Sequence, residues 1–195
     1  MNTNTIVAGR HRQRGRRRHK NDQPPRESVL NIRDAGAADA AAIVAIYNHY
    51  ILTTCVSFEE QSVSEAAMAA RITDLQQAGL PFLAMTEGDA VVGYAYASKW
   101  RVRHAYRFAV ESSIYLVPGL GGKGRGSALY KALLARVARD GIHMVIGGVA
   151  LPNEASVALH EKLGFKKVAH FSEVGFKFGN WIDVAYWELK LSGAE

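Results

Sequence analysis

The 195-residue sequence contains a single cysteine, Cys55, only five prolines and no apolar run long enough to cross a bilayer. One cysteine rules out an intrachain disulfide and gives no sign of an oxidising compartment. A membrane-spanning helix needs about 20 consecutive apolar residues, so a helical membrane protein is excluded. The seven histidines show no ligand spacing with Cys55 or with each other, which argues against a structural zinc site. These absences predict a cytoplasmic globular protein without a metal ion.

Acidic residues are scarce only at the start of the chain. Residues 1–28 carry eight Lys or Arg against two acids, and residues 29–195 carry sixteen of each sign. The net charge of +6 is therefore a property of a tail, and the body is neutral. The tail lacks the roughly 7–15-residue apolar stretch of a secretory signal, and its composition predicts disorder. A solvated arm is the favoured interpretation; weak contact with a polyanion such as nucleic acid and a targeting function are the alternatives.

Apolar periodicity predicts one α+β domain over residues 29–195. In residues 38–51, for example, apolar side chains recur at i, i+3, i+4, i+7 and i+8, which is typical of an amphipathic helix. Further helices are predicted from Ser64 to the Gly79-Leu80-Pro81 break, over 124–140 and over 153–164. Strands are predicted over 29–33, 82–86, 90–97, 107–117, 142–149, 165–174 and 181–191. The order βααβββαβαββ favours a mixed, largely antiparallel sheet flanked by helices.

A glycine-rich loop lies between a predicted strand and a predicted helix. Residues 119–127 read Gly-Leu-Gly-Gly-Lys-Gly-Arg-Gly-Ser. Glycine backbone can approach a ligand closely, and the N–H groups at a helix N-terminus attract phosphate. The loop lacks the Gly-Lys-Ser/Thr ending of a Walker motif. A dinucleotide fingerprint is also excluded, because two helices and a meander precede this strand and no acid follows about 20 residues on in a second strand. Phosphate binding is the favoured interpretation, and a flexible turn is the alternative.

A second motif, Asn153-x-x-Ser156-x-x-Leu159-His160-x-x-Leu163-Gly164-Phe165, follows this loop. In this order the two motifs resemble those of the GNAT acyltransferase superfamily. Within it the chain is similar to the phosphinothricin and methionine sulfoximine N-acetyltransferases. Five stretches carry this likeness in register: 47–51, 106–115, 151–153, 159–161 and 175–184. The tail is not covered. Two positions depart from the superfamily pattern, since Gly121 stands where Gln or Arg is usual and His160 stands where Tyr is usual.

The resemblance implies an acetyl-CoA-dependent N-acetyltransferase whose sheet splays open at its central strands. It implies no metal and a small amino-acid-like amine as acceptor. Backbone of the strand before the loop would bind pantetheine, the loop would hold the pyrophosphate, and Asn153 would bond the pantetheine amide. The predicted cofactor-binding residues are Ile114, Tyr115, Leu116, Gly122, Lys123, Gly124, Arg125, Gly126, Ser127 and Asn153.

Two side chains are predicted to move protons. Glu111 is the only carboxylate in the apolar run 108–117, and a lone acid there is costly unless it is paired or faces a cleft. Partial burial would raise its pKa toward the range of a general base. His160 is the candidate acid for the departing thiolate, with water as the alternative proton source. The alternative interpretations are that Glu111 is exposed or forms a salt bridge and that His160 has only a packing role.

The acceptor is expected beside the basic and aromatic segment 99–106. An amino-acid carboxylate needs a cation, and arginine offers a bidentate fork. A solvated basic loop is the alternative interpretation. Counting the base itself, the candidate substrate-binding residues are Phe58, Arg101, Arg103, His104, Ala105, Tyr106, Glu111, Ser112 and Ser113.

Three wider questions stay open in the sequence. A peptide or polyamine acceptor is the alternative within the enzyme class, although the basic segment disfavours polyamines. A nucleic-acid-binding protein with an inactive acyl-CoA domain is the alternative outside the class, and only the tail supports it. We also expect a homodimer, with Lys177, Trp181 and Asp183 as structural residues near the contact.

Overall fold

The computed structural model describes residues 30–191, so the predicted tail over residues 1–28 lies outside the described part of the chain. The predicted order of elements is confirmed, with two 3₁₀ turns added. The strands are β1 Leu30–Asp34, β2 Phe82–Glu87, β3 Ala90–Lys99, β4 Ala109–Leu116, β5 Met144–Leu151, β6 Lys166–Lys177 and β7 Asn180–Lys190. The helices are α1 Ala40–Thr53, α2 Glu65–Gln77, α3 Arg125–Arg139 and α4 Glu154–Lys162, and the turns are η1 Ala37–Asp39 and η2 His104–Tyr106.

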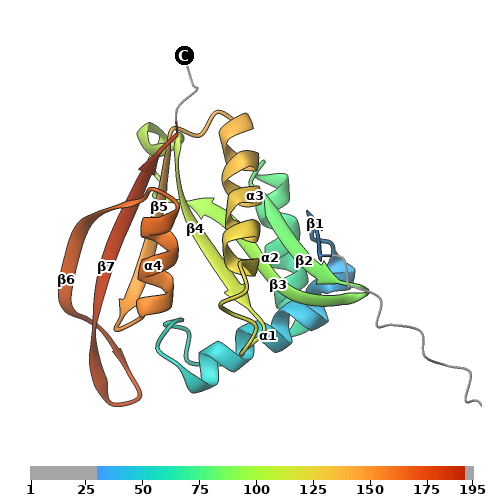
Figure 1. Cartoon of the computed structure of the whole chain (residues 1–195), viewed down its shortest axis with the longest axis horizontal. Coiled ribbons are helices and arrows are strands. Elements are labelled where there is room, and N and C mark those ends of the chain that lie inside the picture. Colours follow the sequence, from blue (N-terminus) through green and yellow to red (C-terminus); the bar gives the residue numbers. More distant parts are fainter. Residues whose placement is uncertain (1–29, 192–195) are drawn as a thin grey trace, which may run out of the picture.

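The strands form one sheet in the order β1-β2-β3-β4-β5-β7-β6. Neighbours are antiparallel except β4 and β5, which run parallel. That parallel pair is short: Ala109, Val110 and Glu111 face Met144, Val145 and Ile146, and the ladder ends there. Beyond this point the two strands diverge (Figure 1). The predicted splay at the central strands is therefore confirmed.

Different helices bury the two faces of the sheet. α1 and α2 cover one face, where their apolar residues pack on Phe82, Ala84 and Tyr94. α3 covers the other face and packs on a separate cluster that includes Val110 and Val145. The buried side chains of α1 and α2 are Ile43, Ile46, Tyr47, Ile51, Met68 and Ile72, and those of α3 are Leu129, Tyr130, Leu133 and Val137. Because side chains alternate along β4, successive residues of this strand point to opposite faces.

Several strand boundaries differ from the predicted ones, and two of these differences are informative. The strand expected from residue 107 begins at Ala109, because residues 104–106 form the turn η2. The strand expected over 165–174 continues to Lys177. It meets the last strand in a two-residue turn at Phe178-Gly179, whose φ angles are 51° and 77°. Positive φ at both positions is the geometry of a two-residue hairpin turn, which Asn-Gly usually signals in a sequence. Because Phe-Gly is not a typical turn sequence, the turn was not predicted. Within residues 30–191, no helix is long and apolar enough to cross a membrane.

Candidate active site

The glycine-rich loop before α3 forms one wall of a groove of about 740 Å³. Gly122 and Gly124 have φ angles of 83° and 78°, which residues with a Cβ rarely adopt. Gly124 is the N-cap of α3, so the loop turns directly into the first turn of a 15-residue helix. The free N–H groups at that end and the helix dipole together favour a phosphate group.

The opposite wall includes the part of β4 that follows Glu111. Its ladder with β5 stops at the Glu111–Ile146 pair, whereas β5 continues to pair with β7 along its whole length. Backbone groups released from a ladder need another hydrogen-bonding partner. The Tyr50 hydroxyl donates to the Leu116 carbonyl at 2.8 Å and so satisfies one of these groups. An extended amide-containing chain such as pantetheine fits the remaining edge.

The groove brings together eight of the ten cofactor-binding residues predicted from the sequence. They are Ile114, Tyr115, Leu116, Gly122, Gly124, Gly126, Ser127 and Asn153. The sequence reasoning missed one face of α4, which contributes Ala155, Leu159 and Lys162 to the lining. Residues 155, 159 and 162 have the i, i+4, i+7 spacing of one helix face. This pattern, in the helix that Asn153 begins, could have revealed them from the sequence. Lys162 adds an exposed cation to this wall.

The two predicted cations of the loop are placed differently. Lys123 lies on the exposed loop. The Arg125 guanidinium is held by Glu87 at the end of β2, with Nη2 2.9 and 2.8 Å from its two carboxylate oxygens. Only 11% of the Arg125 side chain is exposed. Arg125 therefore fastens the start of α3 to the sheet, and it is not among the residues that line the groove.

Glu111 occupies the point where β4 and β5 part. It shares a face of β4 with Tyr115, which packs in the cluster beneath α1 and α2. Gly148 on β5 leaves room for the carboxylate, since a Cβ there would lie 3.1 Å from Oε1 of Glu111. Burial raises the pKa of Glu111, and the positive charge of Arg101 partly opposes this rise. A raised pKa suits a carboxylate that accepts a proton near neutral pH.

Arg101 is the predicted substrate-binding residue whose charge acts on Glu111. Its guanidinium lies 3.9 Å from the centre of the Trp100 ring, and Trp100 packs edge-on against Tyr186 of β7. The charges of Glu111 and Arg101 both act on the pKa of Tyr186, so these groups form one cluster. Sequence reasoning missed Tyr186, because nothing local on the last strand marks it.

Most of the other predicted acceptor residues lie on two loops. Arg103, His104, Ala105 and Tyr106 form the exposed loop that contains η2. Phe58 is 44% exposed and rests against Gly175 of β6.

The two serines after Glu111 lie on opposite faces of β4. Ser113 shares the face of Glu111 and hydrogen-bonds Tyr96, which lowers the pKa of that tyrosine against the larger effect of burial. The buried Ser112 points toward α3 and bonds Tyr130.

His160 lies in a buried chain of hydrogen bonds beneath the groove. Its Nδ1 donates to the Ser156 carbonyl at 2.8 Å, so Nε2 accepts the Tyr130 hydroxyl at 3.1 Å. The Tyr130 hydroxyl in turn lies 2.6 Å from Oγ of Ser112. Gly147 makes room for the ring, because a Cβ there would overlap the imidazole. Burial lowers the pKa of His160, and the ring is therefore neutral at pH 7.

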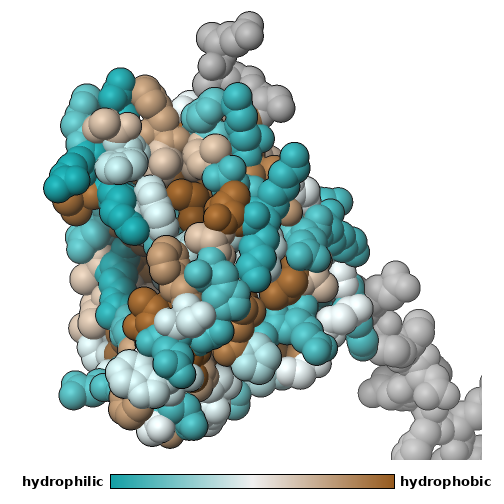
Figure 2. All heavy atoms as spheres, turned by 90° about the vertical axis from the view of Figure 1, so that its left-hand side faces the viewer, coloured by the Kyte–Doolittle hydropathy of each residue, from teal (hydrophilic) through white to brown (hydrophobic). Residues whose placement is uncertain are grey.

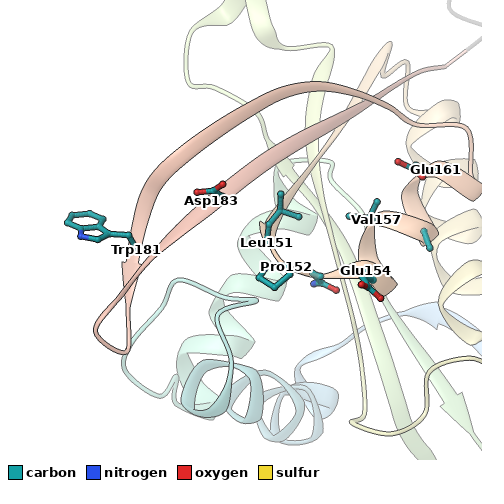
Figure 3. Close-up of a pocket in the computed structure, with 9 residues that line it drawn as sticks. Leu151, Pro152, Glu154, Val157, Glu161, Trp181 and Asp183 are labelled. Carbon is teal, nitrogen blue, oxygen red and sulfur yellow. The ribbon is translucent and has the colours of Figure 1, made fainter.

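A second depression of about 510 Å³ lies between α4, the end of β5 and β7. Figure 3 shows Glu154, Val157 and Glu161 along α4, Leu151 and Pro152 at the end of β5, and Trp181 and Asp183 on β7. Neither Glu111 nor His160 lines it. Across the described part of the chain, no group of three or more His, Cys, Asp or Glu residues could hold a metal ion.

The comparisons with known proteins agree with this geometry. Residues 32–186 match the family model described as an acetyltransferase (GNAT) domain. The chain belongs to the GNAT acetyltransferase family. The splayed strands agree with the fold that the family resemblance implied.

Relatives within the GNAT family have specific names. The chain is 38% identical to an L-methionine sulfoximine/L-methionine sulfone acetyltransferase of Salmonella typhimurium, over 83% of this chain and 95% of that protein. It is 34% identical to a phosphinothricin N-acetyltransferase of Streptomyces coelicolor, over 86% and 99%. A GNAT phosphinothricin acetyltransferase from Sinorhizobium meliloti, solved in complex with AcCoA, superposes with a TM-score of 0.80 and 41% identity. That match covers 83% of this chain and 88% of the other.

Proposed function

We propose that this GNAT protein transfers an acetyl group from acetyl-CoA to the amino group of a small amino-acid-like acceptor. The acceptor class is that of phosphinothricin and methionine sulfoximine, the compounds named for its relatives. The observation that carries the proposal is Glu111, a half-buried carboxylate of raised pKa at the point where β4 parts from β5, within reach of the charge of Arg101. A base at that junction can serve an amine on one side and a thioester on the other.

The residues present fit acetyl-CoA. The Gly122–Ser127 backbone and the start of α3 suit its pyrophosphate, and the open edge of β4 suits its pantetheine arm. Asn153 caps α4 through its side-chain oxygen, which accepts the Ser156 N–H at 3.1 Å, and it also lines the groove. Acetyl-CoA supplies the activated acetyl thioester. Backbone N–H groups of residues 114–116 are the proposed donors to the thioester oxygen as it gains charge.

Glu111 is proposed to take the proton from the acceptor amine, directly or through a water molecule. Arg101, with its guanidinium stacked on Trp100, is proposed to bind the acceptor carboxylate as a bidentate fork. Arg103, His104, Ala105 and Tyr106 form the outer rim in this proposal, and Phe58 and Ser113 line the acceptor side. Holding the two reactants together in this way removes part of the entropic barrier to their reaction.

The departing thiolate needs a proton, from His160 or from water. The geometry favours water. The Nδ1 proton of His160 is held by the Ser156 carbonyl, and burial opposes a charged imidazolium. In this version of the mechanism His160 and Ser112 serve the groove by fixing α3 and α4 against β4, through Tyr130.

A thiol-release assay tests the proposed activity. The purified protein is mixed with acetyl-CoA and a panel of amino acids together with their sulfoximine, sulfone and phosphinate analogues. We expect release with compounds that combine a free α-amino group, a carboxylate and a tetrahedral polar side-chain head. Release only with peptides or polyamines would overturn the proposed acceptor class, and no release with any amine would overturn the activity.

We also propose that the protein is a cytoplasmic homodimer that buries the β6–β7 hairpin. Large apolar residues of this hairpin are about half exposed or more: Val168, Phe171, Val174, Phe176, Phe178 and Trp181. Figure 2 looks onto this side of the molecule and shows apolar residues among hydrophilic ones. An apolar edge strand of this kind favours a protein partner. Sedimentation should show a dimer that Phe176→Ser converts to a monomer; an unchanged mass would exclude this face.

A further inference from the structure

The α1–α2 loop, residues 54–64, joins the two helices that cover one face of the sheet. On its way it passes beside the β6–β7 hairpin (Figure 1). It carries two residues of the site. Val56 lines both the cofactor groove and the narrow gap between β4 and β5. Phe58 is the proposed wall of the acceptor pocket. Val56 is one of many residues along the groove, whereas Phe58 is a main wall of the proposed acceptor pocket. The position of this loop therefore bears chiefly on the acceptor side.

Lys177 of β6 holds the loop from the hairpin side. Its ammonium donates to the Ser57 carbonyl at 2.6 Å and to the Thr54 carbonyl at 2.9 Å, and the residue is 1% exposed. Buried lysines are rare unless their charge has partners. Here two backbone carbonyls are the direct acceptors, and the charges of Glu59 and Glu60 partly offset the lowering of the lysine pKa by burial.

Gly175, two residues earlier on β6, holds the loop through packing. A Cβ at this position would lie 2.3 Å from two carbon atoms of the Phe58 ring, so the ring sits where any other residue would place its side chain. Gly175 lacks the positive φ angle of the turn glycines. Glycine is therefore required here for the contact with Phe58 rather than for backbone conformation.

The other side of the loop is fastened to the helices. The Tyr47 hydroxyl lies 3.1 Å from Oγ of Ser57 and donates to Glu59 at 3.0 Å. Arg71 of α2 bonds both oxygens of Glu59, at 2.7 and 3.2 Å. These bonds hold the loop toward α1 and α2, so the contacts with Lys177 and Gly175 set its position on the hairpin side.

We infer that Lys177 and Gly175 are positioning residues that clamp the α1–α2 loop and thereby set the acceptor pocket through Phe58. This inference rests on the proposed function, because it takes Phe58 as a wall for the acceptor. Neither residue needs to touch the acceptor or acetyl-CoA. The clamp predicts that substitutions in the hairpin weaken acceptor binding, although the hairpin lies outside the cofactor groove.

The first experiment compares Lys177→Met with Lys166→Met, an exposed lysine at the start of the same strand. Met keeps the length of the side chain and removes both hydrogen bonds to the loop. We expect the acceptor KM to rise at least tenfold in Lys177→Met, with the KM for acetyl-CoA within about threefold. Hydrogen exchange of amides 54–60, followed by mass spectrometry, should become faster. Lys166→Met should change neither quantity, and equal behaviour of the two variants would overturn the inference.

The second experiment keeps the inference testable if Lys177→Met fails to fold. Gly175→Ala should displace the Phe58 ring and raise the acceptor KM. Phe58→Leu shortens that side chain, so the double variant should recover much of the loss, because residues in contact are not additive. Additive losses would overturn the clamp. If the wild-type protein acetylates none of the acceptors, the proposed function fails, whereas the exchange measurement on residues 54–60 still tests the clamp.

Discussion

The two sides of the site are built in opposite ways. The cofactor groove is lined mainly by the end of β4, by the glycine loop before α3 and by α4 with its cap. The proposed acceptor side would be made of side chains from β4, the loop before it, the α1–α2 loop and β7. Backbone contacts tolerate many side chains and serve a constant ligand, whereas side chains from distant segments can vary with the acceptor. The comparison predicts that changes on the two sides separate into different kinetic constants.

The largest expected effect belongs to the acceptor side. Glu111→Gln keeps the shape of the side chain and removes the proton acceptor, so kcat/KM for the amine should fall by about 10²–10⁴-fold. Because Glu111 must be ionised to act and its pKa is raised, wild-type activity should fall on acidification at a higher pH than an ordinary glutamate predicts. This acidic limb should disappear in the variant. The measurement is a pH–rate profile at saturating acetyl-CoA.

The KM for acetyl-CoA is the internal control, since the groove does not depend on the Glu111 side chain. Wild-type turnover of Glu111→Gln across pH 6–9 would remove Glu111 from the mechanism. A water chain or His160 would then be the proton acceptor.

The next effect belongs to the cofactor side. Gly122→Ala forces a residue with a Cβ into a left-handed conformation, which costs about 1–2 kcal/mol. If the loop relaxes to avoid this cost, the KM for acetyl-CoA should rise roughly 5–30-fold. Gly121→Ala is the matched control, because Gly121 has no positive φ and its Cβ would meet no atom within 4 Å. Equal KM values for the two variants would show that the left-handed turn is not needed for binding.

A smaller effect on turnover is expected from the buried hydrogen-bond network of Ser112, Tyr130 and His160. Tyr130→Phe removes the hydroxyl that joins Ser112 to His160 and leaves buried polar atoms without their partner. The free energy of unfolding should fall by about 1–3 kcal/mol, while kcat/KM changes only a few-fold. Chemical denaturation and steady-state kinetics measure the two quantities. A loss of kcat comparable to that of Glu111→Gln, without a stability change, would instead make the network part of proton transfer.

The smallest effect is expected from the tail. Deleting residues 1–28 removes eight cations and two acids, so the isoelectric point should fall toward neutral. Turnover should stay within a few-fold of the full chain, because the predicted site residues all lie between Phe58 and His160. Failure of the shortened chain to fold would show that the tail has a structural role. Salt-dependent nucleic-acid binding that the deletion abolishes would support the alternative function of the tail.

Much of the cofactor groove was predictable from the sequence, because its residues are contiguous. The Gly119–Ser127 loop and the Asn153 cap can each be recognised within about ten residues of sequence, and both contribute residues to the groove. Arg125 was the exception. Its charge suggested a phosphate contact, but its partner Glu87 comes from a hairpin that no local pattern connects to the loop. Tyr130 was hidden in the same way, since its partners Ser112 and His160 lie on other elements.

The sequence by itself determined the order of the elements, the glycine loop and the lone carboxylate of the apolar strand, because periodicity, turn residues and burial cost are local properties. Only the tertiary structure decided that β4 and β5 part beside Glu111 and that Tyr186 and Arg101 meet there. It also decided that Ser112 and Ser113 serve opposite faces, and that Lys177 reaches back to Ser57. The physical reason is that a side chain's neighbours across a sheet are set by strand register and helix packing. Those depend on the whole chain burying its apolar surface at once.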